Sequence, residues 1–150
     1  MTVKAAADFI AAYNKRFPTI GQFMDQCVME ARDKGYVETI TGRRRPIPEI
    51  NSRIVAIRKG SERMAINSVV QGSAADLIKL AMKNVYARLE KEHRPSQMLL
   101  QVHDELVFET PADHAEADAA IVREEMTDAM QLTVPLKVEV GWGKNWQEVK

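Results

Sequence analysis

The chain has 150 residues, of which 45 % are hydrophobic and 28 % charged, and its 21 basic and 21 acidic residues cancel. These values are ordinary for a soluble globular domain, and no run of about 18 apolar residues predicts a membrane span. The opening residues show no signal-peptide pattern. Cys27, the single cysteine, cannot form an internal disulfide, which suits a reducing cytoplasm. No CxxC, HExxH or Walker loop is present.

The zero net charge hides a basic half and an acidic half. Between Lys34 and Arg63 there are eight basic residues against three acidic ones, whereas Asp104 to Asp128 contains nine acidic residues and only Arg123 as a base. A basic segment beside carboxylates suits a polyanion held next to metal ions. Two solvated faces of opposite charge are the alternative, and charge alone leaves both open.

The first third of the chain predicts two helices, a strand and a connector. Helices are expected over residues 4–16 and 18–34, because Pro18 suits a first helical turn and Gly35 suits a helix end. Residues 36–41 alternate like a strand, and Gly42 turns the chain into Arg43–Arg45. Two prolines make residues 46–52 a connector.

A long helix is expected next, from Ser61 as N-cap to about Lys91. Its predicted apolar positions are Ile66, Val70, Leu77, Ala81, Val85 and Leu89. Residues 98–102 and 106–109 are rich in strand formers and short enough to be the arms of a hairpin. A further helix should begin at Pro111 and Asp113, with Glu116 completing a capping box. Its predicted apolar face carries Ala119, Val122, Met126 and Met130.

The end of the chain predicts a last strand over residues 133–140, with a tail over 141–146 that packs back on the sheet. Strands with helices segregated to one side of them make an α+β fold.

The turn between the two hairpin arms departs from the usual turn chemistry. A tight hairpin favours Asn-Gly or Asp-Gly, whereas this sequence has His103, Asp104 and Glu105 there. Breaks of a local rule tend to mark functional positions. A merely solvated acidic turn is equally compatible with the pattern, and neighbouring strand residues project to opposite faces, so a site shared by both carboxylates does not follow from it.

A polar stripe follows one face of the expected long helix. Arg63, Asn67 and Gln71 recur every four residues, and their span of about 12 Å covers roughly three to four steps of a nucleic-acid strand. Their side chains offer hydrogen-bond donors, and the minor groove presents acceptors at every base pair. The stripe could grip a duplex without reading its sequence, or it could be only the solvated helix face. Gly72 beside it could permit close approach of a partner backbone.

Three blocks of the sequence resemble the C-terminal part of a family A DNA polymerase of the DNA polymerase I type. They are Gly35-Tyr-Val-Glu-Thr-Ile-Thr-Gly-Arg-Arg-Arg45, the helix segment Glu62-Arg-Met-Ala-Ile-Asn67 through Gln71-Gly-Ser-Ala-Ala-Asp-Leu-Ile-Lys-Leu-Ala-Met82, and Gln101-Val-His-Asp-Glu-Leu-Val-Phe-Glu109. The resemblance implies an incomplete polymerase domain, in which an antiparallel palm sheet with the motif C hairpin packs on long helices. Residues 1–60 would be a remnant of the fingers with a basic connector, and 61–150 the C-terminal part of the palm.

The resemblance also assigns roles to individual residues. Asp104 matches the metal-binding aspartate of motif C, and Glu105 matches its neighbouring catalytic carboxylate. DNA contacts are implied for His103, near the primer terminus, and for Arg63, Asn67 and Gln71. For Arg43, Arg44 and Arg45, and for Lys79, phosphate contact and plain solvated charge are equally compatible with the sequence. The implied cofactor is Mg²⁺, two ions in the complete enzyme. The implied partners are template–primer DNA and deoxynucleoside triphosphates, in the cytoplasm of a bacterium at its nucleoid.

Two parts that the family requires are absent from these 150 residues, namely the metal-binding aspartate of motif A and the motif B helix that binds the incoming triphosphate. We therefore expect the chain alone to be inactive and to need the missing N-terminal part of the polymerase as partner. Because the sheet would have an open edge, we expect self-association or partial disorder, especially over residues 1–35. The alternative function is a non-catalytic module that binds duplex DNA.

Overall fold

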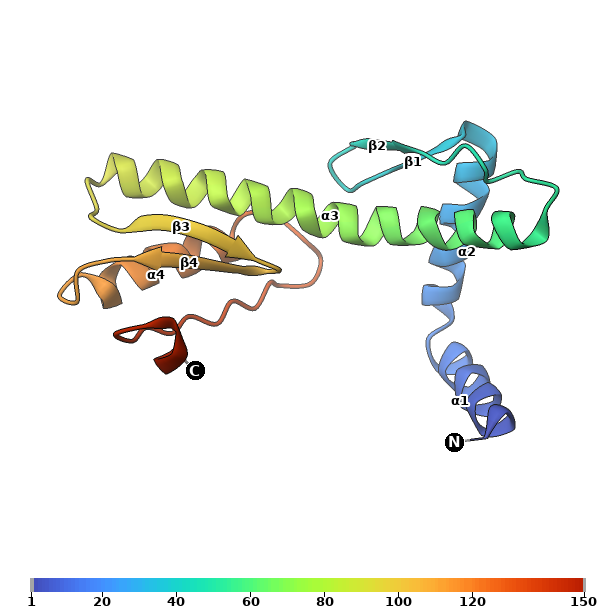
Figure 1. Cartoon of the computed structure of the whole chain (residues 1–150), viewed down its shortest axis with the longest axis horizontal. Helices are drawn as coiled ribbons and strands as arrows, with labels where there is room; N and C mark the ends of the chain where they lie inside the picture. Colours follow the sequence, from blue (N-terminus) through green and yellow to red (C-terminus); the bar gives the residue numbers. More distant parts are fainter. Residues whose placement is uncertain (1, 150) are drawn as a thin grey trace. The chain divides into compact units, whose positions relative to one another are not determined.

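The computed structural model describes residues 2–149, and they form two compact units, Met1–Ser73 and Ala74–Lys150 (Figure 1). Along the chain the elements are α1 Val3–Arg16, α2 Pro18–Lys34, β1 Tyr36–Glu38, β2 Arg44–Pro46, α3 Val55–Lys91, β3 Gln97–Val102, β4 Glu105–Glu109, α4 Ala115–Thr127 and a short 3₁₀ helix, η1 Trp146–Glu148. Helix α3 contributes its first part to the first unit and the remainder to the second. Each unit is described by itself.

The two N-terminal helices begin and end close to where the sequence predicts. The Oγ1 atom of Thr2 caps α1 by accepting a hydrogen bond from the backbone N–H of Ala5 at 3.2 Å. Helix α2 has Pro18 in its first turn and ends at Gly35, whose φ of 77° lies in the left-handed region that glycine adopts without strain. These local signals therefore decided both boundaries.

A short hairpin follows α2. Strand β1 pairs antiparallel with β2, with Tyr36 opposite Pro46, and Gly42 turns between them at a φ of 81°. The expected strand over residues 36–41 is therefore too long, and the expected connector over 46–52 is wrong at its first residue. Proline lacks an N–H and is tolerated at an unpaired edge or strand end, which is where Pro46 lies.

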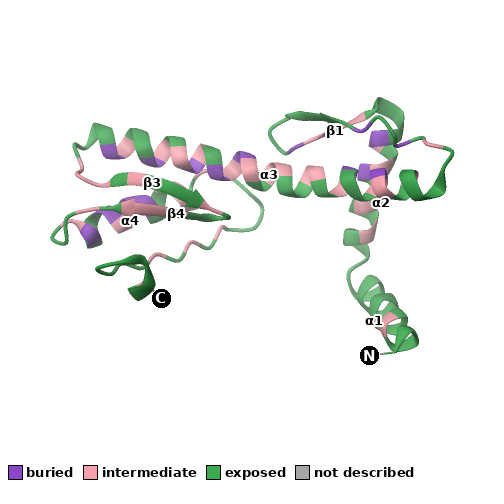
Figure 2. Cartoon of the chain, in the orientation of Figure 1, coloured by how far each residue is buried: buried purple, intermediate pink, exposed green. Residues whose placement is uncertain are grey.

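The core of the first unit is formed by α2, the β1–β2 hairpin, the segment after it, and the start of α3. Its buried residues are Ala31, Val37, Ile47, Ile50 and Ala65, with Val69 packed against them. Helix α1 has no buried residue, and Figure 2 shows it exposed over nearly its whole length. The core therefore holds α2 in place but not α1.

Helix α3 begins earlier than predicted. It starts at Val55, and Ser61 is an interior residue of the helix with 7 % exposure, so the prediction of Ser61 as N-cap is wrong. The reason is local, because nothing between residues 55 and 60 prevents a helical conformation, Gly60 included. Val70 is 54 % exposed, so its predicted place on the apolar face is also wrong. The end at Lys91 is as predicted.

The second unit contains the hairpin that the sequence predicts. Strands β3 and β4 pair antiparallel from Gln97–Glu109 to Val102–Glu105, with an irregular register between Met98 and Leu100. The buried core beneath it comes from α3 and α4 and consists of Val85, Leu89, Ile121 and Val122, with Met98, Phe108 and Met126 packed against it. One face of the hairpin thus rests on two helices (Figure 1).

Helix α4 starts without the predicted capping box. Its N-cap is His114, with helical backbone angles and no side-chain cap, because the chain already turns at Pro111, whose carbonyl oxygen accepts from the His114 N–H at 2.9 Å. Asp113 is therefore not a cap. Of the predicted apolar face, Val122 is buried, whereas Met130 lies beyond the end of the helix.

The predicted strand over residues 133–140 does not form. Residues 133–134 form a bend and 135–140 have no regular secondary structure, and they pair with no strand in the described part of the chain; Pro135 can donate no ladder hydrogen bond. The alternation survives in part, since Leu136, Val138 and Val140 are half-buried while the residues between them are exposed. Trp142 and Trp146 are each 55 % exposed, so the tail does not pack back on a sheet as expected.

The α+β class is as predicted, since helices accompany small antiparallel sheets. One continuous sheet is not present over residues 2–149, where the strands form two separate two-stranded ladders, β1–β2 and β3–β4. None of the helices described between residues 2 and 149 is long and apolar enough to cross a membrane.

Candidate nucleic-acid interface and metal site

The β3–β4 hairpin presents His103 and Asp104 in a two-residue turn. Val102 pairs with Glu105, so only these two residues lie between the strands. His103 has a φ of 57°, a left-handed conformation that is uncommon for a residue other than glycine. The side chain of Gln101 donates from Nε2 to the backbone oxygen of His103 at 2.8 Å and so supports the turn. Strained backbone of this kind gathers at functional sites.

The two carboxylates of the hairpin occupy different positions. Asp104 lies in the turn itself, Glu105 is the first residue of β4, and both are exposed. No group of three or more His, Cys, Asp or Glu residues within residues 2–149 could hold a metal ion by itself. Mg²⁺ is commonly bound by one or two carboxylates, with water and substrate phosphates as the other ligands. The hairpin therefore fits an ion shared with a substrate, and it does not form a cage made by protein alone.

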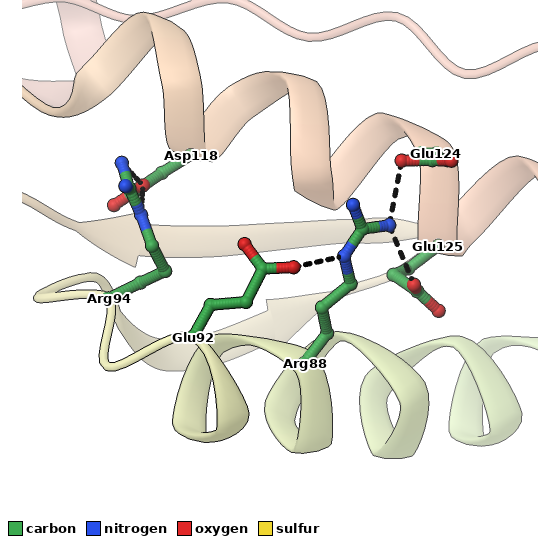
Figure 3. Close-up of polar contacts among 6 residues, drawn as sticks. All are labelled: Arg88, Glu92, Arg94, Asp118, Glu124 and Glu125. Atoms are coloured by element: carbon green, nitrogen blue, oxygen red, sulfur yellow. Dashed lines mark hydrogen bonds and ion pairs between the residues drawn. The ribbon is translucent and has the colours of Figure 1, made fainter.

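The base of this hairpin is held by Asp118, a residue that the sequence reasoning missed. Asp118 lies on α4 with 2 % exposure, and its carboxylate accepts hydrogen bonds from Arg94, from Ser96 Oγ at 2.5 Å and from Thr110 Oγ1 at 3.2 Å (Figure 3 shows the Arg94 contact). Burial raises the pKa of Asp118, but the three donors outweigh it and hold the pKa below its usual value. The sequence did offer one signal for this residue. Asp118 lies four residues before Val122, so it falls on the same, apolar face of the helix.

A second ionic cluster joins α3 to α4. Arg88 donates to Glu92 at 2.8 Å, to Glu124 at 2.7 Å and to Glu125 at 3.0 Å (Figure 3). Hydrogen bonds to these carboxylates, that to Glu92 foremost, raise the pKa of the Arg88 guanidinium. The cluster lies away from the hairpin turn and contacts neither strand, so it secures the helices.

The polar stripe lies on the exposed surface of α3 in the first unit. Arg63, Asn67 and Gln71 are all exposed, and their side chains form no hydrogen bond or ion pair with any residue between 2 and 149. Neighbouring side chains are paired instead, as in the 2.6 Å contact between Arg32 and Glu62. The donors of the stripe are therefore available to a partner.

Gly72 permits close approach of the chain's own hairpin loop. A Cβ atom at this position would lie 2.7 Å from Cγ2 of Thr39 and 3.3 Å from Nη2 of Arg43. Nη2 of Arg43 donates to the Gly72 carbonyl oxygen at 3.2 Å, and Ser73 Oγ accepts from the N–H of Ile40 at 2.9 Å. The space beside Gly72 is thus filled from within the first unit, and the idea that a partner backbone enters it is wrong.

The three consecutive arginines have three different environments. Arg43 bonds to the Gly72 carbonyl, and Arg44 pairs with Glu38 at 2.8 Å while its guanidinium lies 4.8 Å from the ring centroid of Tyr36. Arg45 is exposed, and no contact joins its side chain to the rest of the described chain. Arg45 is therefore the member of the three with an uncommitted charge. Lys79, on α3 in the second unit, is also exposed.

Comparison with known proteins shows the family of this chain. The sequence profile described as DNA polymerase family A matches residues 1–148. The chain belongs to DNA polymerase family A. It is 47 % identical over all its 150 residues to DNA polymerase I of Lactococcus lactis subsp. cremoris, and 48 % identical over 147 residues, 98 % of the chain, to the thermostable DNA polymerase I of Thermus filiformis.

The chain covers only a part of these family A relatives, 17 % of the length of each of the two. A solved structure, the POL domain of Pol1 from M. smegmatis in complex with DNA primer-template and dNTP, matches 97 % of this chain with 40 % identity and a TM-score of 0.93. The match covers 26 % of that structure's chain. The family A fold of the described residues is therefore shared with a polymerase domain.

Proposed function

We propose that this chain forms the C-terminal part of the catalytic domain of a DNA-directed DNA polymerase, residues 1–60 from the fingers and 61–150 from the palm. The observation that carries the proposal is an exposed Asp104 at a two-residue hairpin turn, within a family match that extends over residues 1–148. The reaction is template-directed nucleotidyl transfer. It extends a primer in DNA replication or repair at the bacterial nucleoid.

In this proposal, Asp104 holds Mg²⁺ and Glu105 assists from the adjacent position. With a second ion in the complete enzyme, the metal held by Asp104 would supply the charge that activates the primer 3′-hydroxyl and stabilises the leaving pyrophosphate. The role of His103 is to contact the primer terminus, supported by its place beside Asp104 in the turn. Asp104 lies beyond the last strand pair, Val102–Glu105, and is exposed, so it is open to a substrate.

The duplex is held by the polar stripe of α3. Arg63, Asn67 and Gln71 provide a row of free donors on one face of a helix, which suits the acceptors of the minor groove. Because these acceptors occur at every base pair, the contacts would be independent of sequence. Arg45 adds a phosphate contact, and the deoxynucleoside triphosphate is the second substrate.

The 150-residue chain alone should not extend primers. One aspartate cannot organise two ions, and the family's second metal-binding aspartate and triphosphate-binding helix are not among these residues. Adding the remaining part of a family A polymerase as a separate chain should restore synthesis. Robust metal-dependent extension by the isolated chain would refute this.

The test of the assignment is primer extension by a complete polymerase polypeptide that carries Asp104→Ala. We expect synthesis to be abolished while binding of primer–template persists. Asp113→Ala is the matched control, because Asp113 is also an aspartate in a loop of the second unit and its side chain is 81 % exposed. Synthesis that survives Asp104→Ala, or that falls equally in the control, would contradict the assignment.

A non-catalytic duplex-binding module is the second candidate, favoured by the unpaired donors of the stripe. It predicts DNA binding that weakens with salt and does not respond to Mg²⁺. Gel shifts at two salt concentrations, with and without Mg²⁺, separate the two candidates.

We also propose that the isolated chain self-associates through the open edges of the β3–β4 ladder. Leu99 and Leu100 of β3 are 53 % and 43 % exposed, and unpaired strand edges attract further strands. Sedimentation velocity should show mass rising with concentration, and Leu99→Lys should reduce it. A monomer at all concentrations would refute the proposal.

A further inference from the structure

The β3–β4 hairpin requires support beyond its own hydrogen bonds. A two-stranded hairpin is marginally stable by itself in water, and this ladder has an irregularity between Met98 and Leu100. A bulge leaves one residue unpaired and offers an alternative register close by. A one-residue slip would move every side chain of a strand to the opposite face, and the residues in the turn would change with it.

Asp118 bonds to both chain segments at the open end of the ladder, opposite the turn. Ser96 immediately precedes β3 and Thr110 immediately follows β4, and both hydroxyls donate to the same carboxylate oxygen, Oδ2, at 2.5 and 3.2 Å. This oxygen therefore acts as an additional rung beyond the last backbone pair, Gln97–Glu109. Because the rung involves one hydroxyl from each strand, it forms in only one register.

Arg94 holds the other oxygen of the same carboxylate. Its guanidinium donates to Oδ1, and its backbone N–H donates to the Leu89 carbonyl oxygen at 2.9 Å, which ties it to the end of α3. Nη2 of Arg94 also lies 3.3 Å from Nδ1 of His114. The buried carboxylate belongs to α4 and is tied through Arg94 to the end of α3. Its position is therefore held by contacts other than those to Ser96 and Thr110.

We propose that Asp118 is a positioning residue that fixes the register of the β3–β4 hairpin and so determines which residues occupy its turn. In the observed register the turn consists of His103 and Asp104. This inference rests on the proposed function only for its consequence in catalysis, since the role of Asp104 is itself proposed. The effect on the hairpin can be measured without any activity assay.

The first test is amide hydrogen exchange of the 150-residue chain, followed residue by residue. Asp118→Asn leaves Arg94 without its charged acceptor, and exchange of the β3–β4 ladder amides should accelerate at least about tenfold, the factor that corresponds to about 1.4 kcal/mol. The combined change Ser96→Ala and Thr110→Val removes the rung but keeps the Arg94–Asp118 pair, and it should accelerate the same amides.

Two internal controls accompany this measurement. Glu124→Gln removes one carboxylate charge from α4 at an ion pair that does not contact the hairpin, so its ladder amides should exchange as in the unaltered chain. The amides of the β1–β2 ladder should not change in any variant. If Asp118→Asn fails to fold, the combined Ser96→Ala and Thr110→Val variant, called the hydroxyl double variant, tests the inference by itself. Unchanged exchange at β3–β4 in that variant would overturn the inference.

The second test uses a complete polymerase polypeptide with the hydroxyl double variant. We expect kcat to fall about tenfold and the Mg²⁺ concentration for half-maximal activity to rise, with the dissociation constant for primer–template unchanged. Equal loss of DNA binding and kcat would indicate a general structural role and contradict positioning. If Asp104→Ala left synthesis intact, the proposed function would be wrong. The hydrogen-exchange measurement would still test, independently, whether Asp118 fixes the register of the hairpin.

Discussion

Two glycines of α3 should respond to alanine substitution with opposite signs. Gly60 and Gly72 both lie inside the helix, where alanine is preferred to glycine by about 0.8–1.0 kcal/mol. A Cβ at Gly60 meets nothing within 4 Å, so Gly60→Ala should stabilise the first unit by nearly that full amount. It serves as the matched control for Gly72.

At Gly72 the same gain is opposed by a collision. The added Cβ would lie 2.7 Å from Cγ2 of Thr39, a residue that is only 8 % exposed and cannot move freely, and 3.3 Å from Nη2 of Arg43. Overpacking of this kind costs typically 1–3 kcal/mol, and a weakened bond from Arg43 to the Gly72 carbonyl adds about 1 kcal/mol. After the helix-propensity gain of about 0.8–1.0 kcal/mol is subtracted, we expect Gly72→Ala to destabilise the first unit by about 1–3 kcal/mol.

The assay is urea unfolding followed by far-ultraviolet circular dichroism, with amide exchange of the β1–β2 ladder as a probe of the first unit. Tryptophan fluorescence would not serve, since both tryptophans, Trp142 and Trp146, lie in the second unit. If Gly72→Ala raised the urea midpoint as much as Gly60→Ala does, the reasoning about close approach of Thr39 would be wrong.

Three further predictions concern binding, pH and the buried thiol. Arg63→Ala or Gln71→Ala should weaken duplex binding about five- to tenfold without changing the unfolding free energy, because both side chains are exposed and unpaired; a gel shift equal to the unaltered chain would contradict this. Asp118 has a lowered pKa, so its stabilisation is present above the ordinary carboxyl value of about 3.9 and is lost as the pH falls through the lower folded value. Urea midpoints measured between pH 2 and 5 should show that loss, and the Asp118→Asn variant should lack this contribution to the pH dependence. If the unaltered chain and the variant had the same pH dependence, the prediction would be wrong. Burial and the nearby Glu30 raise the pKa of Cys27, so a thiol reagent at pH 8 should react at least about tenfold more slowly than with the urea-unfolded chain, and equal rates would disprove burial.

Cys27 also lines a shallow recess of about 130 Å³ on the first unit. Its lining residues are Phe23, Gln26, Cys27, Glu30, Val37, Glu38 and Val69. The recess gives a small electrophile a route to the thiol of Cys27, so the reaction rate reports on access to this side chain.

The sequence predicted elements well wherever one local signal decided them. Pro18 and Gly35 marked the limits of α2, and the two runs of strand formers over residues 98–102 and 106–109 predicted both arms of the hairpin. Two local signals failed, the N-cap at Ser61 and the capping box at Asp113, and a further failure occurred where a second segment was needed. Residues 133–140 have a strand-like pattern but pair with no strand in the described chain. Alternation indicates which side chains are buried, but it does not indicate whether a partner strand is present.

The candidate site shows the same division. Asp104 and the stripe beginning at Arg63 could be selected from the sequence, because turn chemistry and helical spacing are local. Asp118 could not be selected from the sequence. Its role depends on hydrogen bonds from Ser96 and Thr110, which reach it only when the hairpin packs on α4. For Gly72, the unusual residue was recognised, but its neighbour Thr39 is 33 positions away in the chain, and no spacing rule connects them.

We propose above that Asp104 holds the metal ion needed for nucleotide addition. The most direct measurement is the single-turnover rate of incorporation by a complete polymerase polypeptide over a range of Mg²⁺ concentrations, with and without Asp104→Ala, on primer–template already bound. We expect Asp104→Ala to lower this rate about a thousandfold, equivalent to about 4 kcal/mol, and additional Mg²⁺ not to restore it. An unchanged rate at saturating Mg²⁺ would contradict it.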